Sequence, residues 1–546
     1  MKRKKERLTV HPCFLILTCA IQVLYGVISM YAAVLINAVA NTVSVTTSLA
    51  QLLRVGVPAI GFAVVYAGFR ALSSGMTQLY AERVSQTLRS RLNRVVFSMD
   101  CAAFTERDSG EYLNLMVGDV RIVRDQYNSQ IPLLFCYVAQ FVFCVAYSIF
   151  LNPVVAAIMI VMSGIQYIVP LFWGKKINKM TVVQSRESAR FTSKAKELLF
   201  GFSIIKTYRA QRKMQEDFDR SNQDMARACE KAAVMTHVMM SVNMMIAWMM
   251  ILTSVIVAGC FVIQGEMQAG AILTVFYIAN RYSMPVTDFV DAYTKIKGSR
   301  GVREKLNRFF DSHAVLETPP IYRIHSTIAV SNLYFSYGAD STPVLRDVSF
   351  TFQKGKKYLI LGESGCGKST LLKVIAGQYQ AKGVLVDGVP VENLPSDALA
   401  GTIVLVGQQP YVFQRSIAEN IDLLHSGDRA RLTKVARQCC IDDFISSLPE
   451  GIDTQVDEEQ RRLSGGQKAR IELARALYAR PDVLLLDEVT GALDPDTAFR
   501  IEKMLLTLSE IMVIHIAHKP AYELRKEYDA ILTMQAGRIA EISYPS

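Results

Sequence analysis

The stretch that decides the fold reads Gly362-Glu363-Ser364-Gly365-Cys366-Gly367-Lys368-Ser369-Thr370. An apolar run at residues 358–361 precedes it, and a second apolar run at residues 371–375 follows it. The first run predicts a β-strand and the second predicts the start of a helix, so the glycines lie in the turn between them. Small residues in such a turn bring backbone N–H groups close to phosphate oxygens, and the helix N-terminus adds its positive end. The stretch therefore predicts a phosphate-binding loop.

A lysine and a serine in the loop, together with an acidic pair downstream, indicate what the loop binds. In the G-x-x-x-x-G-K-S pattern, Lys368 reaches the β- and γ-phosphates of a nucleotide, and the Ser369 hydroxyl ligates Mg²⁺. Downstream, an apolar run at residues 483–486 ends in Asp487 and Glu488. In this arrangement one carboxylate steadies Mg²⁺ and the next polarises a water molecule. The two motifs together predict a domain that binds and hydrolyses a nucleoside triphosphate.

Between these motifs stands the pentapeptide Leu463-Ser464-Gly465-Gly466-Gln467, about twenty residues before the Asp-Glu pair. In this respect the chain resembles the ATP-binding cassette (ABC) family, whose defining signature is this pentapeptide at this position. The resemblance implies that Ser464 and the amides of Gly465 and Gly466 cap the γ-phosphate of ATP bound to a second copy of the domain. One chain would then be unable to complete an ATP site.

Four smaller motifs match the same family. The resemblance implies that Tyr337 stacks on adenine, that Gln408 senses Mg²⁺ and the membrane domain, that Asp494 acts across a dimer, and that His518 contacts the γ-phosphate. Simpler interpretations exist for Tyr337 as core packing, for Gln408 as a surface amide and for His518 as a helix cap. The order and spacing of all the motifs favour the family. The nucleotide-binding set so implied is Tyr337, Gly362, Ser364, Gly365, Cys366, Gly367, Lys368, Ser369, Thr370, Gln408, Ser464, Gly465, Gly466 and Gln467.

Catalytic and metal-binding roles follow from the same match. Lys368, Glu488 and His518 are the expected catalytic residues, with Glu488 activating the attacking water. The expected Mg²⁺ ligands are Ser369, Gln408 and Asp487, so the cofactors are ATP and Mg²⁺. Three departures from the usual family pattern concern signalling between domains rather than hydrolysis. They are the sequence of residues 488–492, Asp457 and Gln460.

The first half of the chain has a different composition from the second. It contains six apolar stretches near the length of about twenty residues that spans a bilayer. They are residues 12–40, 55–75, 131–151, 154–173, 234–263 and 270–292. The sixth is the weakest, because Asn280, Arg281 and Pro285 interrupt it. The predicted fold class is therefore a membrane all-α domain with six helices followed by a soluble α/β P-loop NTPase domain, and the family resemblance implies that the membrane domain is of the ABC exporter type.

Basic residues indicate the orientation in the membrane. Lysines and arginines at positions 2–7 precede the first span, and the long segments 77–130 and 174–233 are rich in both residues. Such segments stay in the cytoplasm, so both chain ends and the ATPase domain are expected there, in a multi-pass protein of the cell membrane. The net charge of +11 then reflects contact with anionic headgroups rather than with nucleic acid.

The two long segments also resemble the intracellular loops of exporter-type family members. Residues 81–119 match the first loop, and residues 197–208 match the second loop, whose coupling helix docks on the opposite subunit. Generic amphipathic helices are the alternative for each. The expected domains are a membrane domain at 1–297, an extended linker at 298–325 that contains Pro319-Pro320, and a nucleotide-binding domain at 326–546.

The sequence says less about the partner subunit and the transported cargo than about the ATP site. Because both Glu488 and the signature are intact, two copies of this chain would form two competent sites, which favours a homodimer over a heterodimer with another half-transporter. The fifth span is rich in methionine, which suits either a pliable cargo surface or ordinary helix packing, and the second is favoured. Arg281 is a candidate for an anionic group on the cargo. ATP-driven export of an amphipathic compound, peptide or lipid is favoured, with an importer of exporter fold or a non-pumping regulator as alternatives.

Overall fold

The computed structural model describes residues 11–45, 48–105, 107–313, 321–337, 342–394, 397–424, 426–456, 463–517 and 521–545. These residues form two compact units. The first contains the described parts of 1–93 and 110–313, and the second contains those of 94–109 and 314–546. His518, Asp457, Gln460 and the Pro319-Pro320 pair lie outside the described residues.

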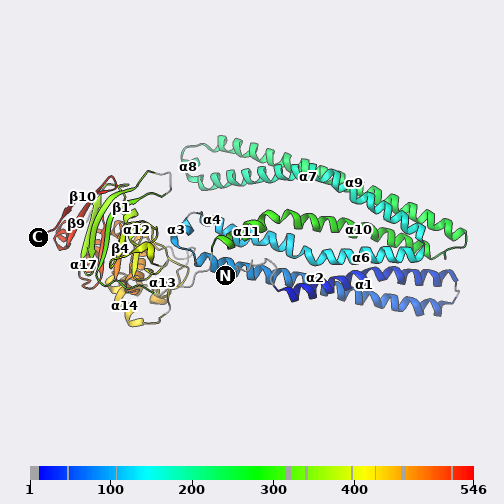
Figure 1. The fold of residues 1–546 in the computed structure, drawn as a ribbon, viewed down its shortest axis with the longest axis horizontal. Coiled ribbons are helices and arrows are strands. Elements are labelled where there is room, and N and C mark those ends of the chain that lie inside the picture. The colour runs from blue at the N-terminus through cyan, green and yellow to red at the C-terminus, as the bar shows by residue number, and fades with distance from the viewer. Residues whose placement is uncertain are drawn as a thin grey trace. The chain divides into compact units, whose positions relative to one another are not determined.

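Long helices make up the first unit and run side by side along its length (Figure 1). They are α1 (Pro12–Val45), α2 (Leu49–Phe97), α6 (Gln130–Leu151), α7 (Pro153–Phe200), α9 (Gln211–Ile263) and α10 (Ala271–Gly298). Among the described residues, five helical segments are long and apolar enough to cross a membrane, namely Pro12–Val43, Leu49–Phe97, Ser109–Leu151, Pro153–Gly174 and Gln211–Ile263. They contain the first five predicted spans.

The sixth predicted span is helical but is not one of those five, because charged residues such as Arg281 and Asp288 follow its apolar beginning. Its inner face is nevertheless buried. Val275, Ala279 and Tyr282 of α10 pack with residues of α1, α6, α7 and α9 in one apolar cluster. Burial of this face against the other helices therefore holds α10 in the bundle, although α10 is not apolar enough to count as a membrane span by hydropathy.

Local sequence sets the sharp turn between α6 and α7. The Asn152 side chain accepts hydrogen bonds from the backbone N–H groups of Val154 and Val155, at 2.9 and 3.2 Å. Pro153 occupies the first turn of α7, where a missing N–H has no cost. Asn152 thus caps α7, and residues 152–153 alone separate the predicted spans 131–151 and 154–173.

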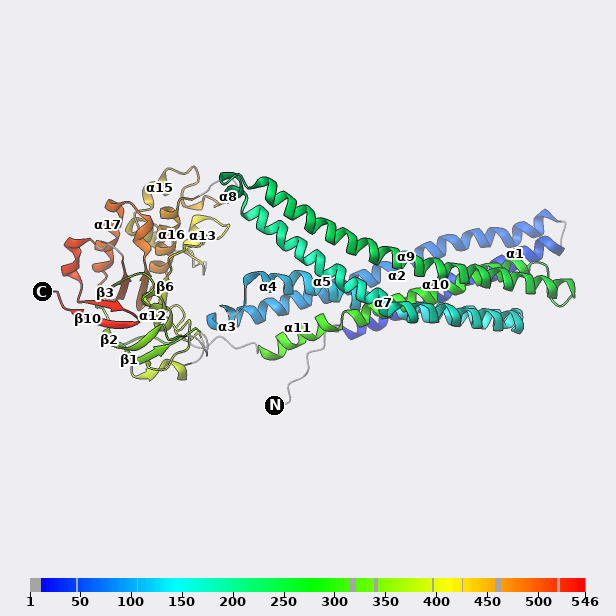
Figure 2. The same ribbon diagram turned by 90° about the horizontal axis from the view of Figure 1, so that it is seen from above.

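The helices extend well beyond the apolar spans. α4 (Ser109–Asn114), two π-helical turns at Leu115–Asp119 and Arg124–Asn128, and α5 (Val120–Val123) lead into α6. The α7–α9 hairpin has the short helix α8 (Phe202–Thr207) at its tip (Figure 2). α4 and the first π-helical turn lie in the segment 81–119, and α8 lies in the segment 197–208, the two segments that resemble the family loops.

The expected extended linker is wrong for Arg300–Ser312, which form helix α11. Leu306 and Phe309 on one face of α11 are buried, and the Phe309 ring packs against Tyr112 with ring centroids 6.3 Å apart. The Lys305 ammonium also lies 2.9 Å from the buried Asp119 carboxylate. This charged pair and the apolar face hold α11 against the first unit, so the segment does not stay extended.

Two sheets form the centre of the second unit. A four-stranded antiparallel sheet has the order β2 (Leu345–Gln353), β1 (Thr327–Phe335), β4 (Val384–Val386) and β5 (Val389–Pro390). A six-stranded sheet has the order β10 (Arg538–Ser543), β9 (Ala530–Gln535), β3 (Lys357–Gly362), β8 (Met512–Ile516), β7 (Val483–Asp487) and β6 (Ile403–Val406). All neighbours in the second sheet are parallel except β9 and β10.

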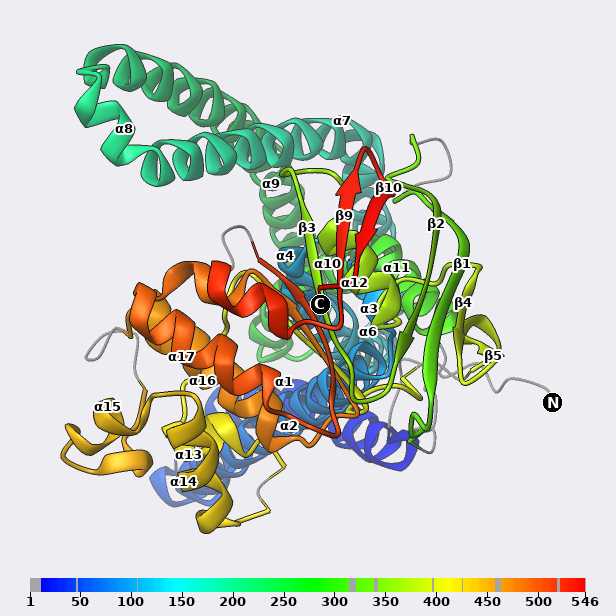
Figure 3. The ribbon, with the colours of Figure 1, turned by 90° about the vertical axis from the view of Figure 1, so that its left-hand side faces the viewer.

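Helices surround the larger sheet (Figure 3). They are α12 (Lys368–Ile375), α13 (Ile417–Ile421), α14 (Arg429–Gln438), α15 (Asp442–Ser446), α16 (Gly465–Tyr478) and α17 (Pro495–Leu506), with 3-10 turns at Val391–Asn393, Gly451–Asp453, Val489–Ala492 and Tyr522–Glu527. The helices α12, α16 and α17 lie beside the sheet, and α13 and α14 pack on α16. One apolar core joins α12 to both sheets, and a second joins the sheet to α13, α14, α16 and α17. The parallel sheet with helices on it is the predicted P-loop NTPase architecture.

A short helix from the N-terminal half of the sequence also belongs to the second unit. α3 (Cys101–Thr105) begins where the Asp100 carboxylate accepts a 2.7 Å hydrogen bond from the Ala103 N–H. Asp100, Cys101 and Ala102 line a cavity of about 300 Å³ together with Ala376, Gly377 and the segment before β6. α3 therefore packs beside the helix that follows the phosphate-binding loop.

Candidate functional site

The phosphate-binding loop runs from the end of β3 to the start of α12. Gly367 has φ of 103°, in the left-handed region, and a Cβ there would lie 2.9 Å from Leu345 Cδ2. Only glycine meets both requirements. No side chain caps the N-terminus of α12. Its first N–H groups therefore point out of the helix without a side-chain acceptor, which is the arrangement that binds phosphate.

Lys368 is folded over this loop. Its ammonium donates hydrogen bonds to the carbonyl oxygens of Gly362 and Glu363, at 2.9 and 2.8 Å, and the side chain is buried. Cys366 is also buried, with its Sγ 3.9 Å from the Lys368 ammonium. Ser364 and Gly365 are exposed at the turn of the loop. The loop thus holds the Lys368 ammonium beside the glycines, where a phosphate group can come close to the backbone.

Asp487, at the end of β7, faces the start of α12. The Ser369 hydroxyl donates to Asp487 Oδ1 at 3.0 Å, although the two residues are far apart in sequence. Burial raises the pKa of the Asp487 carboxyl, while the Ser369 hydrogen bond and the charges of Lys373 and Lys368 act in the opposite direction. The Ser369 hydroxyl and the Asp487 carboxylate thus place two oxygen donors of the kind that Mg²⁺ prefers side by side.

Glu488 and Gln408 meet at the carboxyl ends of adjacent strands. The Gln408 amide donates to Glu488 Oε2 at 2.9 Å, and β6 and β7 pair in register just before the two residues. Glu488 itself has φ of 56°, an unfavourable value for a residue with a side chain. Backbone strain of this kind is found at functional sites, where surrounding structure holds it. Gln408 is exposed, so its amide remains accessible from outside the domain.

Tyr337 lies beside the phosphate-binding helix. Its hydroxyl is 2.8 Å from the buried Thr370 hydroxyl, and its ring contacts Phe335 and Tyr379 edge-on. The side chain is 53% exposed, which does not fit the simpler interpretation as core packing. An exposed aromatic face next to a phosphate loop is a suitable surface for a nucleotide base.

The signature pentapeptide begins helix α16. The Gln467 N–H donates to Ser464 Oγ at 3.2 Å, and the Ser464 N–H donates to Gln467 Oε1 at 2.8 Å. These reciprocal bonds form a capping box, which fixes the helix start. Ser464 and Gly465 are exposed, so the N-terminal end of α16 is accessible.

The signature lies at a different part of the sheet from the phosphate-binding loop. α16 packs against β6, whereas the loop follows β3, and β8 and β7 lie between these two strands. Three strand spacings of about 4.8 Å correspond to about 14 Å. Among the described residues, no hydrogen bond or ion pair joins 463–467 to 362–370. The Asp494 carboxylate caps α17 by accepting from the Thr497 N–H at 2.9 Å, and it is exposed near this part of the domain.

Two charged residues of α16 were not identified in the sequence. Arg475 donates through Nε to the Asn420 carbonyl at 2.7 Å and through Nη1 to the Tyr411 carbonyl at 3.1 Å. Burial raises the pKa of Glu472, three residues earlier, and lowers the pKa of Arg475. Arg475 thus ties the signature helix to the segment that follows Gln408. The only signal in the sequence is that these two charged residues stand within the otherwise apolar run 471–477 of the helix.

Comparison with known proteins supports the assignment of both units. Residues 345–491 match the family described as ABC transporter, and residues 15–286 match the ABC transporter transmembrane region. An ATP-dependent lipid A-core flippase of Photobacterium profundum is 27% identical over 84% of this chain and 79% of its own length. A fatty acid ABC transporter ATP-binding/permease protein of Mycobacterium bovis is 23% identical over 85% of this chain and 74% of its own.

A solved structure shows the same fold. The structure of a bacterial Atm1-family ABC exporter with ATP bound has a TM-score of 0.79 to this chain at 21% identity, covering 97% of this chain and 95% of that one. The chain therefore belongs to the ABC transporters, with a transmembrane domain and an ATP-binding domain of exporter type. It binds ATP, and its ATPase activity is coupled to transport across a membrane.

Proposed function

We propose that two copies of this chain form a homodimer in which each ATP lies between the phosphate-binding loop of one copy and the signature of the other. The observation that carries this proposal is the exposed, capped N-terminus of α16, a helix that packs on β6, three strands away in the sheet from the strand β3 that leads into the loop of its own chain. A helix N-terminus is a good site for a phosphate group. A second ABC subunit would bring this end to the γ-phosphate, and the intact Glu488 and signature of this chain favour a second copy of it in that role.

Within this site, each described residue has a role that its position supports. Lys368 and the N–H groups of the loop hold the phosphates, and the exposed Tyr337 ring contacts the adenine. Ser369, Asp487 and Gln408 hold Mg²⁺, which would neutralise charge on the phosphates. Glu488 accepts a hydrogen bond from Gln408 and orients the attacking water. His518 is proposed as a further contact to the γ-phosphate on the strength of the motif.

The helical extensions are proposed to transmit the movement of the ATP-binding domains. The large apolar side chains of α8 and its flanks are exposed, including Phe200 at 86% and Tyr208 at 79%. Exposed apolar side chains at the tip of a helical hairpin favour docking on another protein surface. We place this surface on the ATP-binding domain of the second copy. The membrane domain is assigned to 1–297, the linker to 298–325 and the nucleotide-binding domain to 326–546, with α11 inside the linker.

We propose that the cargo is an amphipathic compound, of lipid rather than peptide type, exported across the cell membrane with the ATP-binding domains in the cytoplasm. The similarity to a lipid A-core flippase and to a fatty acid transporter supports a lipid-type cargo. Helix α9 exposes Met240, Met244 and Met249, whose flexible side chains suit contact with acyl chains.

The test of this function is the ATPase rate of the full chain in lipid nanodiscs, for the wild type beside Glu488→Gln. The substitution keeps the size of the side chain and an oxygen that accepts from Gln408, so folding and ATP binding should persist. Loss of a water-activating carboxylate is expected to lower the rate by about 10²- to 10⁴-fold. Glu541→Gln on the exposed strand β10 is the matched control. Unchanged hydrolysis in Glu488→Gln would remove Glu488 from this role.

A further inference from the structure

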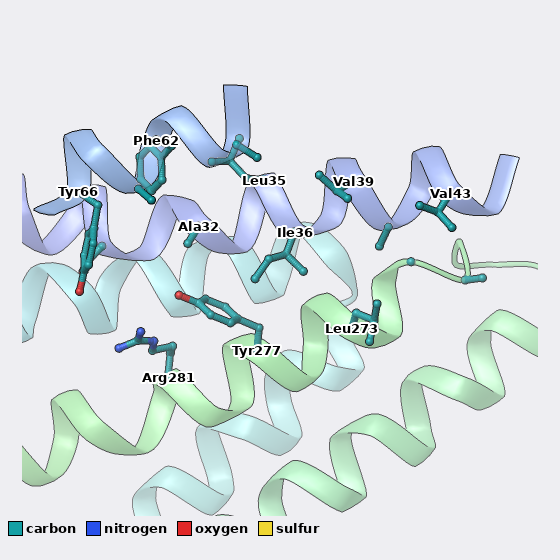
Figure 4. A pocket seen from close by; sticks show the side chains of 16 residues that line it. Ala32, Leu35, Ile36, Val39, Val43, Phe62, Tyr66, Leu273, Tyr277 and Arg281 are labelled. Atoms are coloured by element: carbon teal, nitrogen blue, oxygen red, sulfur yellow. The ribbon is translucent and has the colours of Figure 1, made fainter. Parts of the chain in front are cut away.

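A cavity of about 660 Å³ lies within the first unit, between helices α1, α2 and α10 (Figure 4). Its volume is in the range that holds one drug-sized ligand. On α1 the lining runs from Ser29 to Val43. At a rise of 1.5 Å per residue these fourteen steps correspond to about 21 Å, so the cavity is elongated along the helices.

The two ends of this cavity differ in chemistry. Along most of its length it is lined by apolar side chains such as Ile36, Val39 and Leu273. The polar groups gather at one end, where Figure 4 shows the Arg281 guanidinium and the hydroxyl groups of Tyr66 and Tyr277 close together. A long apolar shaft with one polar end has the shape and polarity of a single amphiphilic molecule.

Arg281 is the charged residue that lines the polar end, and a second cation, Arg70 of α2, interacts with the Tyr66 side chain there. Arg281 lies ten residues after the first residue of α10, Ala271, and thus about 15 Å from that end of the helix. The hydrocarbon core of a bilayer is about 30 Å thick, so with the start of α10 at one edge of the core, Arg281 lies at the depth of its middle. An arginine at this depth is costly and is retained where it serves a function.

No carboxylate neutralises this arginine among the residues that the structure describes. Its guanidinium carbon lies 5.5 Å from the centre of the Tyr277 ring, a cation–π contact that leaves the charge in place. The Tyr66 hydroxyl, which lies 3.3 Å from the Tyr25 hydroxyl, offers hydrogen bonding but no counter-charge. The polar end of the cavity is therefore complementary to an anion.

We propose that the cavity between α1, α2 and α10 binds a single-chain anionic amphiphile, with its carboxylate or phosphate at Arg281 and its acyl chain along the apolar shaft. This inference rests on the proposed lipid-type export and names the class of cargo more closely. A fatty acid or a lysophospholipid has one chain and one anionic head and fits this description. A two-chain membrane phospholipid shares the anionic head, but its second chain has no place in the shaft.

The experiment measures equilibrium binding of radiolabelled palmitate, and of its uncharged methyl ester, to the full chain in phosphatidylcholine nanodiscs without ATP. Arg281→Gln should weaken palmitate binding at least about tenfold and leave the ester unaffected, because only the charged head is lost. Arg281→Lys should restore most of the affinity. Arg54→Gln, at the exposed start of α2, is the matched control and should bind palmitate like the wild type. Ala32→Phe, inside the shaft, should weaken both ligands.

Equal palmitate affinity in the wild type and Arg281→Gln, or equal affinity of the wild type for palmitate and its ester, would overturn the proposal. Displacement of palmitate by phosphatidylglycerol in the discs, lost in Arg281→Gln, would identify a two-chain bilayer lipid as the ligand and overturn it as well. Retained binding of a fluorescent ATP analogue shows that each variant is folded. Palmitate binding needs no hydrolysis, so failure of this inference and failure of the Glu488 assignment are separate results.

Discussion

The composite ATP site is tested most directly by disabling its two halves in different copies of the chain. Gly465→Asp disables the signature without disturbing its own chain, because a Cβ at Gly465 has its nearest neighbour, Ala492 Cβ, at 4.0 Å. Gly466 is unsuitable, since its Cβ would lie 3.1 Å from the Ala492 carbonyl oxygen. An aspartate in the first turn of α16 also interacts favourably with the helix dipole. Lys368→Met removes the cation of the phosphate-binding loop.

The size of the defect follows from the charge that Gly465→Asp brings to the γ-phosphate. Two like unit charges about 4 Å apart repel each other by about 4 kcal/mol at an effective dielectric constant of about 20. Because each 1.36 kcal/mol changes an equilibrium or rate constant tenfold, homodimers of this variant should lose about a thousandfold in ATP turnover. Homodimers of Lys368→Met should be similarly inactive.

The assay is ATP hydrolysis by mixed dimers, isolated through two affinity tags and placed in nanodiscs. When Gly465→Asp and Lys368→Met are on different chains, one of the two composite sites has an intact loop and an intact signature. This dimer should retain about half of the wild-type rate if the two sites act independently. When both substitutions are on one chain and its partner is wild type, both composite sites are broken and the dimer should be inactive.

A site completed within one chain predicts the opposite order. The wild-type partner would then keep a whole site, and the dimer with both substitutions on one chain would be the more active. That result would refute the reasoning from the position of α16. Gln467→Ala serves as a control for the helix start, because it removes one bond of the capping box while leaving the exposed Ser464 hydroxyl and the Gly465 amide.

Two further predictions concern the ATP-binding domain. Cys366 is buried in the phosphate-binding loop, so N-ethylmaleimide should inactivate the ATPase slowly, ATP should protect it, and Cys366→Ala should stay active under the reagent; inactivation of Cys366→Ala at the wild-type rate would contradict this. Burial lowers the pKa of His515 from 6.5 to about 4, and its Nδ1 lies 3.0 Å from the Tyr528 hydroxyl. Between these pH values the unfolded chain binds the extra proton, so the free energy of unfolding should fall as the pH drops from 6.5 towards 4. His515→Phe should flatten this part of a plot of Tm against pH, and an unchanged slope would exclude His515 as its source.

Much of the ATP-binding domain is predictable from short stretches of sequence. The strand, loop and helix around Gly367 follow from an apolar run, closely spaced glycines and a second apolar run, which act on neighbouring residues. The start of α16 follows in the same way, because Ser464 and Gln467 have the spacing of a capping box. Asn152-Pro153 likewise fixes a helix start through local hydrogen bonds. These features depend on residues a few positions apart, so the sequence displays them directly.

Other features depend on contacts between segments that are far apart in the sequence. α11 has apolar residues at helical spacing, but Pro319-Pro320 led to the expectation of an extended linker, and only the contacts of Phe309 with Tyr112 and of Lys305 with Asp119 show where this helix packs. Arg475 donates a hydrogen bond to the Asn420 carbonyl, and no short sequence pattern predicts this hydrogen bond.

The sequence by itself indicated the class of the protein, the five helices apolar enough to cross a membrane, and the candidate residues of the ATP site. Only the tertiary structure decided that α16 lies at a distance from the loop of its own chain, and that Arg281 of α10 meets Tyr66 of α2 at the polar end of an apolar cavity. The physical reason is the distance along the chain over which the responsible interactions act. Periodicity, capping and turn chemistry act within one or two turns of the chain, whereas the order of strands and the packing of helices are set by burial of the whole apolar surface.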